Sequence, residues 1–527
     1  MRSLAGSMKA HDMNGSRVGR KADPWIPFCN LLIYLLIAGL PFILTVLIVN
    51  TEFHTPLSSF VPNGSDEVDY WLEVRGASTC GLAIGSFNND ENLAALGLRQ
   101  FGPHGPAYPL LFAPLATISG WHYSTAIYWN AAFIAVSIFC FLASAKLQGR
   151  DLLLFTFLVP ILAPILLFIP YTVQESLHFC LAMLLATSLR RIFSRDAELV
   201  TPLSRPRLTT AFFLLALLAL LLRPTWAIAL AGLVPFVSWR DRSILTAEIL
   251  LSMLAMKFTW VATSPVLSSV LGGGSHTTLE ILGSIFIHLG HSLTFLFTRH
   301  GAYPMEVVLR FQVMLLIVGA LAMSIVGWSK HSRERQTQQF YLVMNLGGML
   351  VLLLLFYDMF ALRDFRALAP PLILSLCITI GVPRLRRILI VVAISNVLLF
   401  PMFLTSYQSI HAQHFQSGTA SIERFQKEIS PDISYSADSS MWDNTLLFAP
   451  SNYEDLQTFL GLPPGFGLSI CFGQLPLQLP PRSRYIIADS SRLAEWGNNV
   501  RLRPIRMTSR GMLFENLSRQ EGRKLGN

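Results

Sequence analysis

The chain has 527 residues, of which 52% are hydrophobic and 13% are charged, and its mean hydropathy is +0.50. This composition excludes a water-soluble protein, because a soluble domain cannot bury so much apolar surface, and it indicates repeated membrane-spanning helices. The net charge of +9 does not indicate nucleic-acid binding. The basic residues form short clusters between apolar runs instead of one stripe, which is typical of multi-pass membrane proteins.

A basic N-terminal segment precedes the first apolar run, Leu31 to Val49. The run is long for the core of a signal peptide, and no small-residue cleavage site follows it. We therefore expect a retained span with a cytoplasmic N-terminus. Assigning every later cluster of Lys and Arg to the cytoplasm predicts about eleven spans in an all-α membrane domain, with the C-terminus outside.

The predicted spans lie near residues 28–49, 122–144, 152–170, 173–190, 209–222, 225–239, 244–262, 306–328, 340–357, 367–382 and 387–404. Two further apolar stretches, Pro106 to Gly120 and Leu279 to Phe297, would break the alternation. We expect them to form re-entrant or interfacial helices on the outer face. The chain then divides into a cytoplasmic tail (1–27), a transmembrane domain (28–404) and an outer domain (405–527).

The first outer loop, residues 50–123, carries a short run with three acids, Asp66, Glu67 and Asp69. A carboxylate at a membrane face can act as a general base toward a hydroxyl group, and several together could hold a divalent cation. Tyr70, which follows, suits stacking on a sugar or anchoring at the interface. The alternative is a solvated loop whose acids only keep it outside the membrane.

Further along the loop, His104 lies in a turn rich in Gly and Pro that leads into a short helix. A histidine there could bind a phosphate or a sugar hydroxyl, or it could only hydrogen-bond the turn. Arg299 and His300, which follow the second re-entrant stretch, invite the same interpretation as phosphate ligands.

Glu175 begins an apolar helix, where the helix dipole favours a carboxylate. A glutamate so close to hydrocarbon usually has a partner, and Arg223, between two closely spaced spans, is one candidate. The alternative for Arg223 is an interfacial arginine whose guanidinium extends to the lipid headgroups.

Arg363 and Arg366 lie at the outer end of a predicted span. Arginine suits a lipid-linked phosphate because its guanidinium binds phosphate through two parallel hydrogen bonds. The alternative is a set of internal salt bridges with the neighbouring Asp358 and Asp364.

After Phe403 the composition becomes mixed, with Pro-rich turns. Three short apolar runs are predicted to be buried strands, namely Asn444–Ala449, Arg484–Asp489 and Gly511–Asn516, with a helix from Tyr453 to Leu460 between the first two. We therefore expect a small α/β domain on the outer side.

The order of these parts resembles the GT-C fold of polytopic glycosyltransferases that use polyprenyl-phosphate-linked sugars, such as the protein O-mannosyltransferases and the bacterial aminoarabinose transferases. The resemblance covers roughly residues 28–404. It rests on Asp66-Glu67 and Asp69-Tyr70, on His104-Gly105-Pro106 and Tyr108-Pro109, on Gln174-Glu175-Ser176, and on Arg363 to Pro370. The short second re-entrant loop and the C-terminal domain depart from the family pattern.

The resemblance implies inverting transfer of a sugar from a polyprenyl-phosphate donor to a glycan, lipid or protein acceptor at the outer face of the plasma (inner) membrane. Asp66 is the best match to the family's catalytic base. The implied partners are the lipid-linked donor, membrane lipid and the acceptor, and no nucleic acid. No metal site or cofactor is predicted by the residue pattern, apart from the divalent cation that the acids could hold.

Two alternatives from other classes remain open at the level of sequence. A lipid transporter or flippase also has buried charges and re-entrant helices. The chain shows no inverted repeat, however, and its polar residues collect on one predicted face. A polysaccharide polymerase or ligase would also keep arginines on an outer loop.

Overall fold

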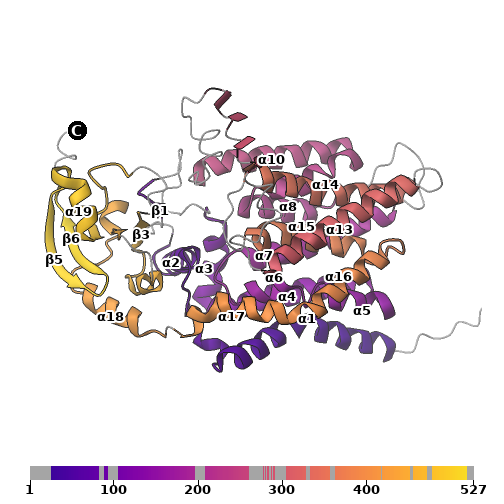
Figure 1. The fold of residues 1–527 in the computed structure, drawn as a ribbon, viewed down its shortest axis with the longest axis horizontal. Coiled ribbons are helices and arrows are strands. Elements are labelled where there is room, and N and C mark those ends of the chain that lie inside the picture. Colours follow the sequence, from indigo (N-terminus) through magenta and orange to yellow (C-terminus); the bar gives the residue numbers. More distant parts are fainter. Residues whose placement is uncertain are drawn as a thin grey trace, which may run out of the picture.

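The structure, a computed structural model, describes residues 25–81, 88–92, 105–195, 208–259, 304–327, 333–356, 363–416, 418–450, 455–471 and 477–518, with short pieces between 277 and 290. Most of the chain is helical, and a small sheet lies at its C-terminal end (Figure 1). This combination confirms the predicted helical domain followed by a small α/β domain.

The helices up to the sheet are α1 (Trp25–Phe53), α2 (Ser65–Cys80), α3 (Ala107–Ser119), α4 (Thr125–Ala145), α5 (Gly149–Leu158), α6 (Ala163–Phe168), α7 (Glu175–Arg195), α8 (Thr210–Leu222), α9 (Trp226–Ala231), α10 (Trp239–Thr259), α13 (Pro304–Gly327), α14 (Arg333–Phe356), α15 (Arg363–Thr379), α16 (Arg386–Leu398), α17 (Phe400–Gln416) and α18 (Ala420–Ile429). Short 3₁₀ helices occupy Leu57–Ser59 (η1) and Val234–Phe236 (η2).

Among the described residues, three helices are long and apolar enough to cross a membrane: Cys29–Phe53 in α1, Thr125–Ala145 in α4 and Pro304–Ala322 in α13. The pair α16 and α17, bent by 54°, would count as a fourth if it forms one span. All of them overlap predicted spans, although α17 extends to Gln416, beyond the predicted end at residue 404. They indicate association with a membrane. The other predicted segments also contain helices, but these are shorter or more polar, so eleven spans are not confirmed.

Proline explains one of the shortened segments. The predicted span 152–170 is divided into α5, which ends at Leu158, and α6, which begins at Ala163. Pro160 has no backbone N–H to donate and cannot continue a helix interior, whereas Pro164 is tolerated in the first turn of the next helix. A continuous apolar run in the sequence therefore becomes two short helices.

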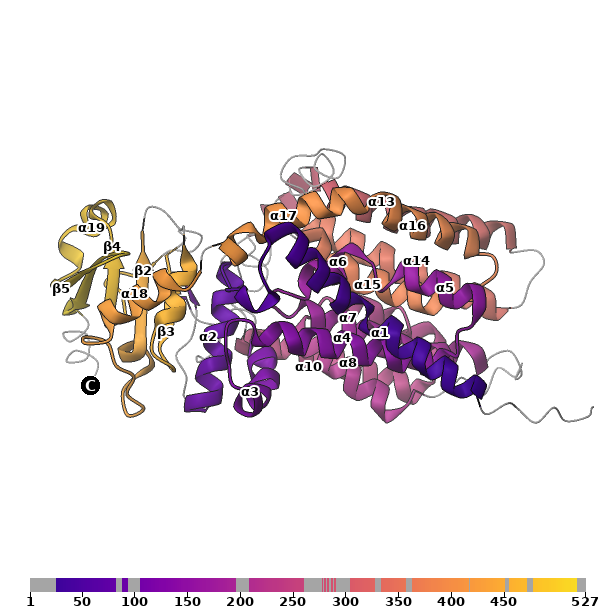
Figure 2. The ribbon, with the colours of Figure 1, turned by 90° about the horizontal axis from the view of Figure 1, so that it is seen from below.

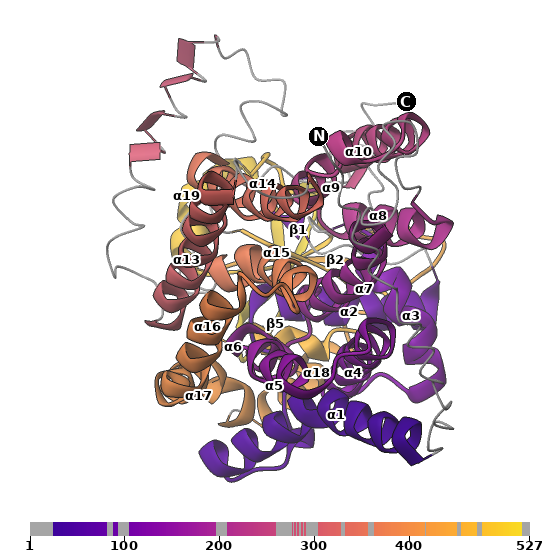
Figure 3. The same ribbon diagram turned by 90° about the vertical axis from the view of Figure 1, so that its right-hand side faces the viewer.

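Helices α7 and α15 lie at the centre of the helical region, surrounded by the others when the molecule is seen along its long axis (Figure 3). Their residues are buried almost throughout, from Leu177 to Leu189 and from Phe365 to Ile380. Each begins with a charged segment, at Glu175 and at Arg363. These two largely buried helices therefore carry charges at their first turns.

The sheet has six strands in the order β1-β3-β2-β4-β6-β5. They are β1 (Asn88–Asn89), β2 (Thr445–Ala449), β3 (Gly467–Ile470), β4 (Tyr485–Ala488), β5 (Leu502–Thr508) and β6 (Gly511–Asn516). The first four in this order pair in parallel, and β6 pairs antiparallel with β4 and β5. Helix α19 (Ser490–Trp496) and the 3₁₀ helices η3 (Met441–Asn444), η4 (Leu456–Gly461) and η5 (Gly497–Asn499) complete the domain. The predicted strands correspond to β2, β4 and β6, and the predicted helix is the 3₁₀ helix η4.

Helix α2 joins the two parts of the molecule and lies between the sheet domain and the other helices (Figure 2). Its residues Val68 and Trp71 share a buried apolar cluster with Phe425 of α18 and Phe459 of η4. Arg75, one turn beyond Trp71, donates hydrogen bonds to the carbonyl oxygens of Leu460 and Leu462 at 3.2 and 3.0 Å. The helix that carries the first-loop acids is therefore packed directly against the C-terminal domain.

The segment 50–123 also contributes to the sheet itself. Strand β1 pairs with β3, with Asn88 opposite Ser469. Glu91, just beyond β1, is buried and accepts hydrogen bonds from the backbone N–H groups of Arg482 and Ser483 at 2.6 and 2.9 Å. The sheet domain therefore includes residues from within the segment 50–123, and it is not made of residues 405–527 alone.

Candidate functional site

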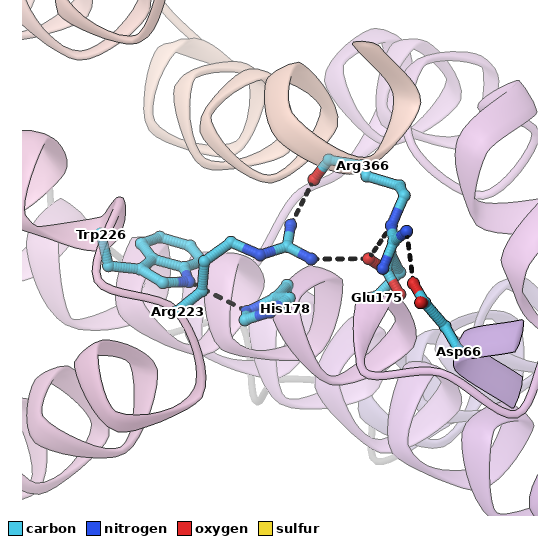
Figure 4. Close-up of polar contacts among 6 residues, drawn as sticks. All are labelled: Asp66, Glu175, His178, Arg223, Trp226 and Arg366. Atoms are coloured by element: carbon cyan, nitrogen blue, oxygen red, sulfur yellow. Dashed lines mark hydrogen bonds and ion pairs between the residues drawn. The ribbon is translucent and has the colours of Figure 1, made fainter. Parts of the chain in front are cut away.

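Four charged residues that are far apart in the sequence meet at the end of the helical region that faces α2 (Figure 4). The Arg366 guanidinium is central to this network. Its Nη1 donates to Asp66 Oδ2 at 2.7 Å, and its Nε donates to Glu175 Oε1 at 2.6 Å. Arg223 Nη2 donates to the same Glu175 oxygen at 2.6 Å, and Arg223 Nη1 donates to the carbonyl oxygen of Arg366 at 2.6 Å. Two arginines and two carboxylates thus form one connected, charge-balanced group.

Helix termini place these side chains. Asp66 and Glu175 lie in the first turns of α2 and α7, where the partial positive charge of the helix end favours a carboxylate. Arg223 directly follows the last residue of α8, where a cation is favoured. Arg366 is the exception, because it lies in the first turn of α15, where the helix end disfavours a cation. The two carboxylates that it contacts offset this unfavourable position.

The four side chains of the network differ in their exposure. The Glu175 side chain is 0% exposed and that of Arg223 is 10% exposed, whereas Arg366 and Asp66 are 29% and 32% exposed. Glu175 therefore lies on the buried side of the group, while a ligand in the surrounding medium can reach Arg366 and Asp66. The Glu175–Arg223 pair that the sequence suggested is present, and Arg366 pairs with Asp66 and Glu175.

A second polar pair lies behind Arg223. Trp226 at the start of α9 donates its indole N–H to His178 Nδ1 at 3.0 Å, and both residues are buried (Figure 4). The sequence did not single out either residue. The only local signal is at His178, which lies three positions after Glu175 in α7, because residues three apart lie on one helix face.

A small hollow of about 20 Å³ adjoins Arg223. Its walls are mostly apolar and include Trp226, Met349, Pro370 and Pro371, which come from α9, α14 and α15. The guanidinium network is therefore bordered by apolar surface between helices.

Glu67 is placed differently from its neighbour Asp66. It is 1% exposed, and its carboxylate accepts hydrogen bonds from the backbone N–H groups of Asn63, Gly64 and Thr172 and from His414. Internal hydrogen bonds therefore occupy both oxygens of this carboxylate. Its geometry is that of a structural carboxylate.

Asp69 is 1% exposed, and neither of its carboxylate oxygens has a hydrogen-bond partner among the residues that the structure describes. Burial, together with the nearby charges of Glu73 and Asp66, raises the pKa of Asp69 well above its usual range. Tyr70 is also buried, and its ring lies 4.5 Å from the ring of Tyr108. Of the three first-loop acids, Asp66 is the one with access to a ligand.

The remaining predicted site residues are not placed by the structure. His104, Arg299 and His300 lie outside the described residues, and so does Asp358. Arg363 begins α15, but its side chain is outside the description. Within the described segments, no group of three or more His, Cys, Asp or Glu side chains could hold a metal ion.

Comparison of the chain with protein-family models, with curated proteins and with solved structures gives no match. The chemistry of the site must therefore be argued from its own residues.

Proposed function

We propose that the protein is a membrane glycosyltransferase that moves a sugar from a polyprenyl-phosphate donor to a hydroxyl acceptor at the outer face of the membrane, with inversion. The observation that carries the proposal is the ion-pair network in which a reachable carboxylate, Asp66, shares the Arg366 guanidinium with the buried Glu175. The proposed base, Asp66, and an anion-binding group, Arg366, are thus held side by side. Base-assisted attack of a hydroxyl with phosphate as the leaving group requires both.

In the proposed reaction, Asp66 removes the proton from the acceptor hydroxyl as its oxygen attacks the anomeric carbon. The new carbon–oxygen bond forms as the bond from that carbon to the phosphate oxygen breaks, and the electron pair leaves with the lipid phosphate. Arg366 and Arg223 meet the negative charge that develops on this leaving group. Displacement in line inverts the anomeric carbon.

Arg366 has room for the phosphate in this scheme. Its Nε and Nη1 contact Glu175 and Asp66, while its Nη2 has no hydrogen-bond partner among the described residues. Binding of phosphate at the exposed side of the guanidinium weakens the Arg366–Asp66 pair, which frees the Asp66 carboxylate to accept a proton.

Glu67 and Asp69, two of the predicted catalytic acids, have other roles in this proposal. Glu67 is occupied by internal hydrogen bonds, and Asp69 is buried with a raised pKa, so neither presents a carboxylate to an acceptor. Both lie in α2 and affect the reaction through the position of Asp66. Tyr70 is buried against Tyr108 and is not available for stacking on a sugar in this arrangement.

We also propose that the protein is a multi-pass protein of the plasma (inner) membrane, with the N-terminus in the cytoplasm and the sheet domain outside. The alternation of Lys and Arg clusters supports this orientation. A single cysteine at the C-terminus of a variant without the six native cysteines should react with an impermeant thiol reagent in intact cells. Protection of this cysteine, with reaction of one placed at the N-terminus, would invert the topology and place Asp66 on the cytoplasmic side.

The direct test is a paired assay on purified protein reconstituted into sealed vesicles. Transfer of labelled sugar from a polyprenyl-phosphate donor to a panel of hydroxyl acceptors supports the proposal. Movement of the lipid-linked sugar across the membrane without cleavage of the sugar–phosphate bond would replace it with a transporter. Extension of a glycan by a preformed lipid-linked oligosaccharide would identify a polymerase or ligase.

A further inference from the structure

Glu67 forms hydrogen bonds with three parts of the chain around the site: the start of α2, the turn before α7, and α17. Its Oε2 accepts hydrogen bonds from the N–H groups of Asn63 and Gly64 at 3.2 and 3.1 Å, which caps the N-terminus of α2. Its Oε1 accepts the N–H of Thr172, at 3.1 Å, in the turn that leads into α7. The neighbour of Asp66 in the sequence is thus bonded to the turn that precedes Glu175.

His414 completes these contacts from α17. Its Nε2 lies 2.5 Å from Glu67 Oε2, and both side chains are buried. The imidazole stacks on the ring of Phe60 at 5.0 Å between centroids and meets Tyr171 edge-on at 5.1 Å. Its Nδ1 has no hydrogen-bond partner within the described part of the chain, so the proton lies on Nε2, which donates to Glu67.

The consequence for the site is geometric. Asp66 and Glu175 contact different nitrogens of Arg366, so their separation decides whether one guanidinium can hold both. Glu67 connects the backbone that carries Asp66 with the backbone that leads to Glu175. His414 anchors the Glu67 carboxylate from α17, which is followed along the chain by α18 and the sheet domain.

We propose that Glu67 and His414 form a buried positioning pair that sets the Asp66 carboxylate against Arg366, so that the C-terminal part of the chain determines the geometry of the proposed active site. This inference rests on the proposed function for its catalytic consequence, although the positioning itself can be measured without activity. His414 touches no reacting group, and it acts through Glu67.

Two substitutions at His414 separate its hydrogen bond from its packing. His414→Phe keeps the ring that stacks on Phe60 but removes the donor. His414→Gln loses the ring but places an amide N–H near the position of Nε2. His411→Phe is the matched control, because His411 lies one turn earlier in α17, is equally buried and contacts Tyr171, yet its Nε2 meets the Leu167 carbonyl oxygen and not Glu67.

The first measurement is amide hydrogen exchange of the purified full-length variants in peptides that cover residues 63–68 and 168–175. The N–H groups that donate to Glu67 lie in these two segments. His414→Phe should speed exchange in both segments, whereas His414→Gln and His411→Phe should leave it near the wild-type rate. If His414→Phe does not fold, Glu67→Gln, which keeps the side-chain size, is measured in the same way.

The second measurement is steady-state transfer. His414→Phe should lower kcat by roughly 10- to 100-fold with donor KM within about twofold of wild type, because a misplacement near 1 Å of a reacting group costs about that much. His414→Gln should restore most of kcat, and His411→Phe should retain it.

The outcomes are distinct. Unchanged exchange in His414→Phe, equal losses in His414→Phe and His411→Phe, or faster exchange with unchanged kcat would each overturn the proposal. If the wild-type protein transfers no sugar, the proposed function fails. The exchange contrast between the two histidines then decides by itself whether the pair positions Asp66.

Discussion

Two regions of the molecule each contain a carboxylate that lies between two arginines. Comparing the two groups shows why only one of them is a candidate site. In the helical region Glu175 lies between Arg223 and Arg366, and in the sheet domain Glu515 lies between Arg484 and Arg503. The motif of charges is the same. The surroundings differ, because Arg484 and Arg503 are 43% and 65% exposed, whereas Arg223 and Arg366 are 10% and 29% exposed.

The origin of the two groups also differs. Arg503 and Glu515 are directly opposite each other on the paired strands β5 and β6, so sheet register alone brings them together. Glu175, Arg223 and Arg366 come from three helical segments, and a fourth element, α2, adds Asp66. Solvent screens the pair on the sheet, so it contributes little. The helical group is largely buried, and its most exposed member is the carboxylate of Asp66.

The largest expected effect is on transfer by Asp66→Asn. The amide cannot accept the acceptor's proton, so kcat should fall about 10²- to 10⁴-fold, as is typical for loss of a general base, while donor binding is retained. Glu515→Gln is the control, because it removes a carboxylate from a matching pair of arginines on the sheet and should leave kcat near wild type. Near-normal turnover in Asp66→Asn would remove Asp66 from the mechanism.

Glu175→Gln should have the largest effect on stability. It leaves two poorly exposed guanidiniums with Asp66 as their only carboxylate in the network, and breaking a buried ion pair costs about 3–5 kcal/mol. The free energy of unfolding in detergent, measured by denaturant titration or thermal shift, should fall by that order. The corresponding loss for Glu515→Gln should be at most about 1 kcal/mol. Equal losses in the two variants would contradict the distinction between the two regions.

Arg366→Lys should weaken binding of the donor. Lysine keeps one positive charge but cannot donate to Asp66, Glu175 and a phosphate from a planar fork. Loss of one charge-assisted hydrogen bond, about 1.5–3 kcal/mol, corresponds to a rise of roughly 10- to 100-fold in the apparent donor Kd. Arg503→Lys on the sheet should leave that Kd unchanged. If Arg366→Lys does so as well, Arg366 is structural and the phosphate is held elsewhere.

The smallest expected effect is a pH-dependent gain in stability from Asp69→Asn. Burial raises the pKa of Asp69, so the folded state binds its proton more tightly than the unfolded state. The stability contributed by this proton is fully present below the unfolded pKa of about 3.9 and is lost as pH rises through the folded pKa. Asparagine does not ionise, so the melting temperature of Asp69→Asn should exceed that of wild type by more at pH 8 than at pH 4. A difference that is independent of pH would show that Asp69 does not titrate abnormally.

Part of the site could be predicted because charged residues stand out in an apolar chain. Glu175, Arg223 and Arg366 were identified at the ends of apolar runs, and Asp66 was identified from its run of acids in the segment 50–123. The structure brings these four residues together. His414 escaped prediction because it lies beyond the last predicted span, and its neighbours in the sequence give no sign of a partner nearly 350 positions away.

The sheet shows the same limit. Strands β2, β4 and β6 follow from short apolar runs, whereas β1 consists of Asn88 and Asn89, which have no strand pattern. Two asparagines form a strand here because the open edge of β3 supplies backbone partners for them. An edge created by tertiary packing is invisible in the local sequence.

The sequence by itself determined that the chain associates with membranes, that its C-terminal part forms strands, and which charges lie at helix ends, since all of these follow from local apolar pattern. Only the tertiary structure decided which acid meets which arginine, because the partners are separated by 48, 191 and 300 positions. It also separated the roles of Asp66 and Glu67. Adjacent residues in the first turn of a helix point in different directions, so one carboxylate reaches Arg366 and the other is enclosed by His414 and Thr172.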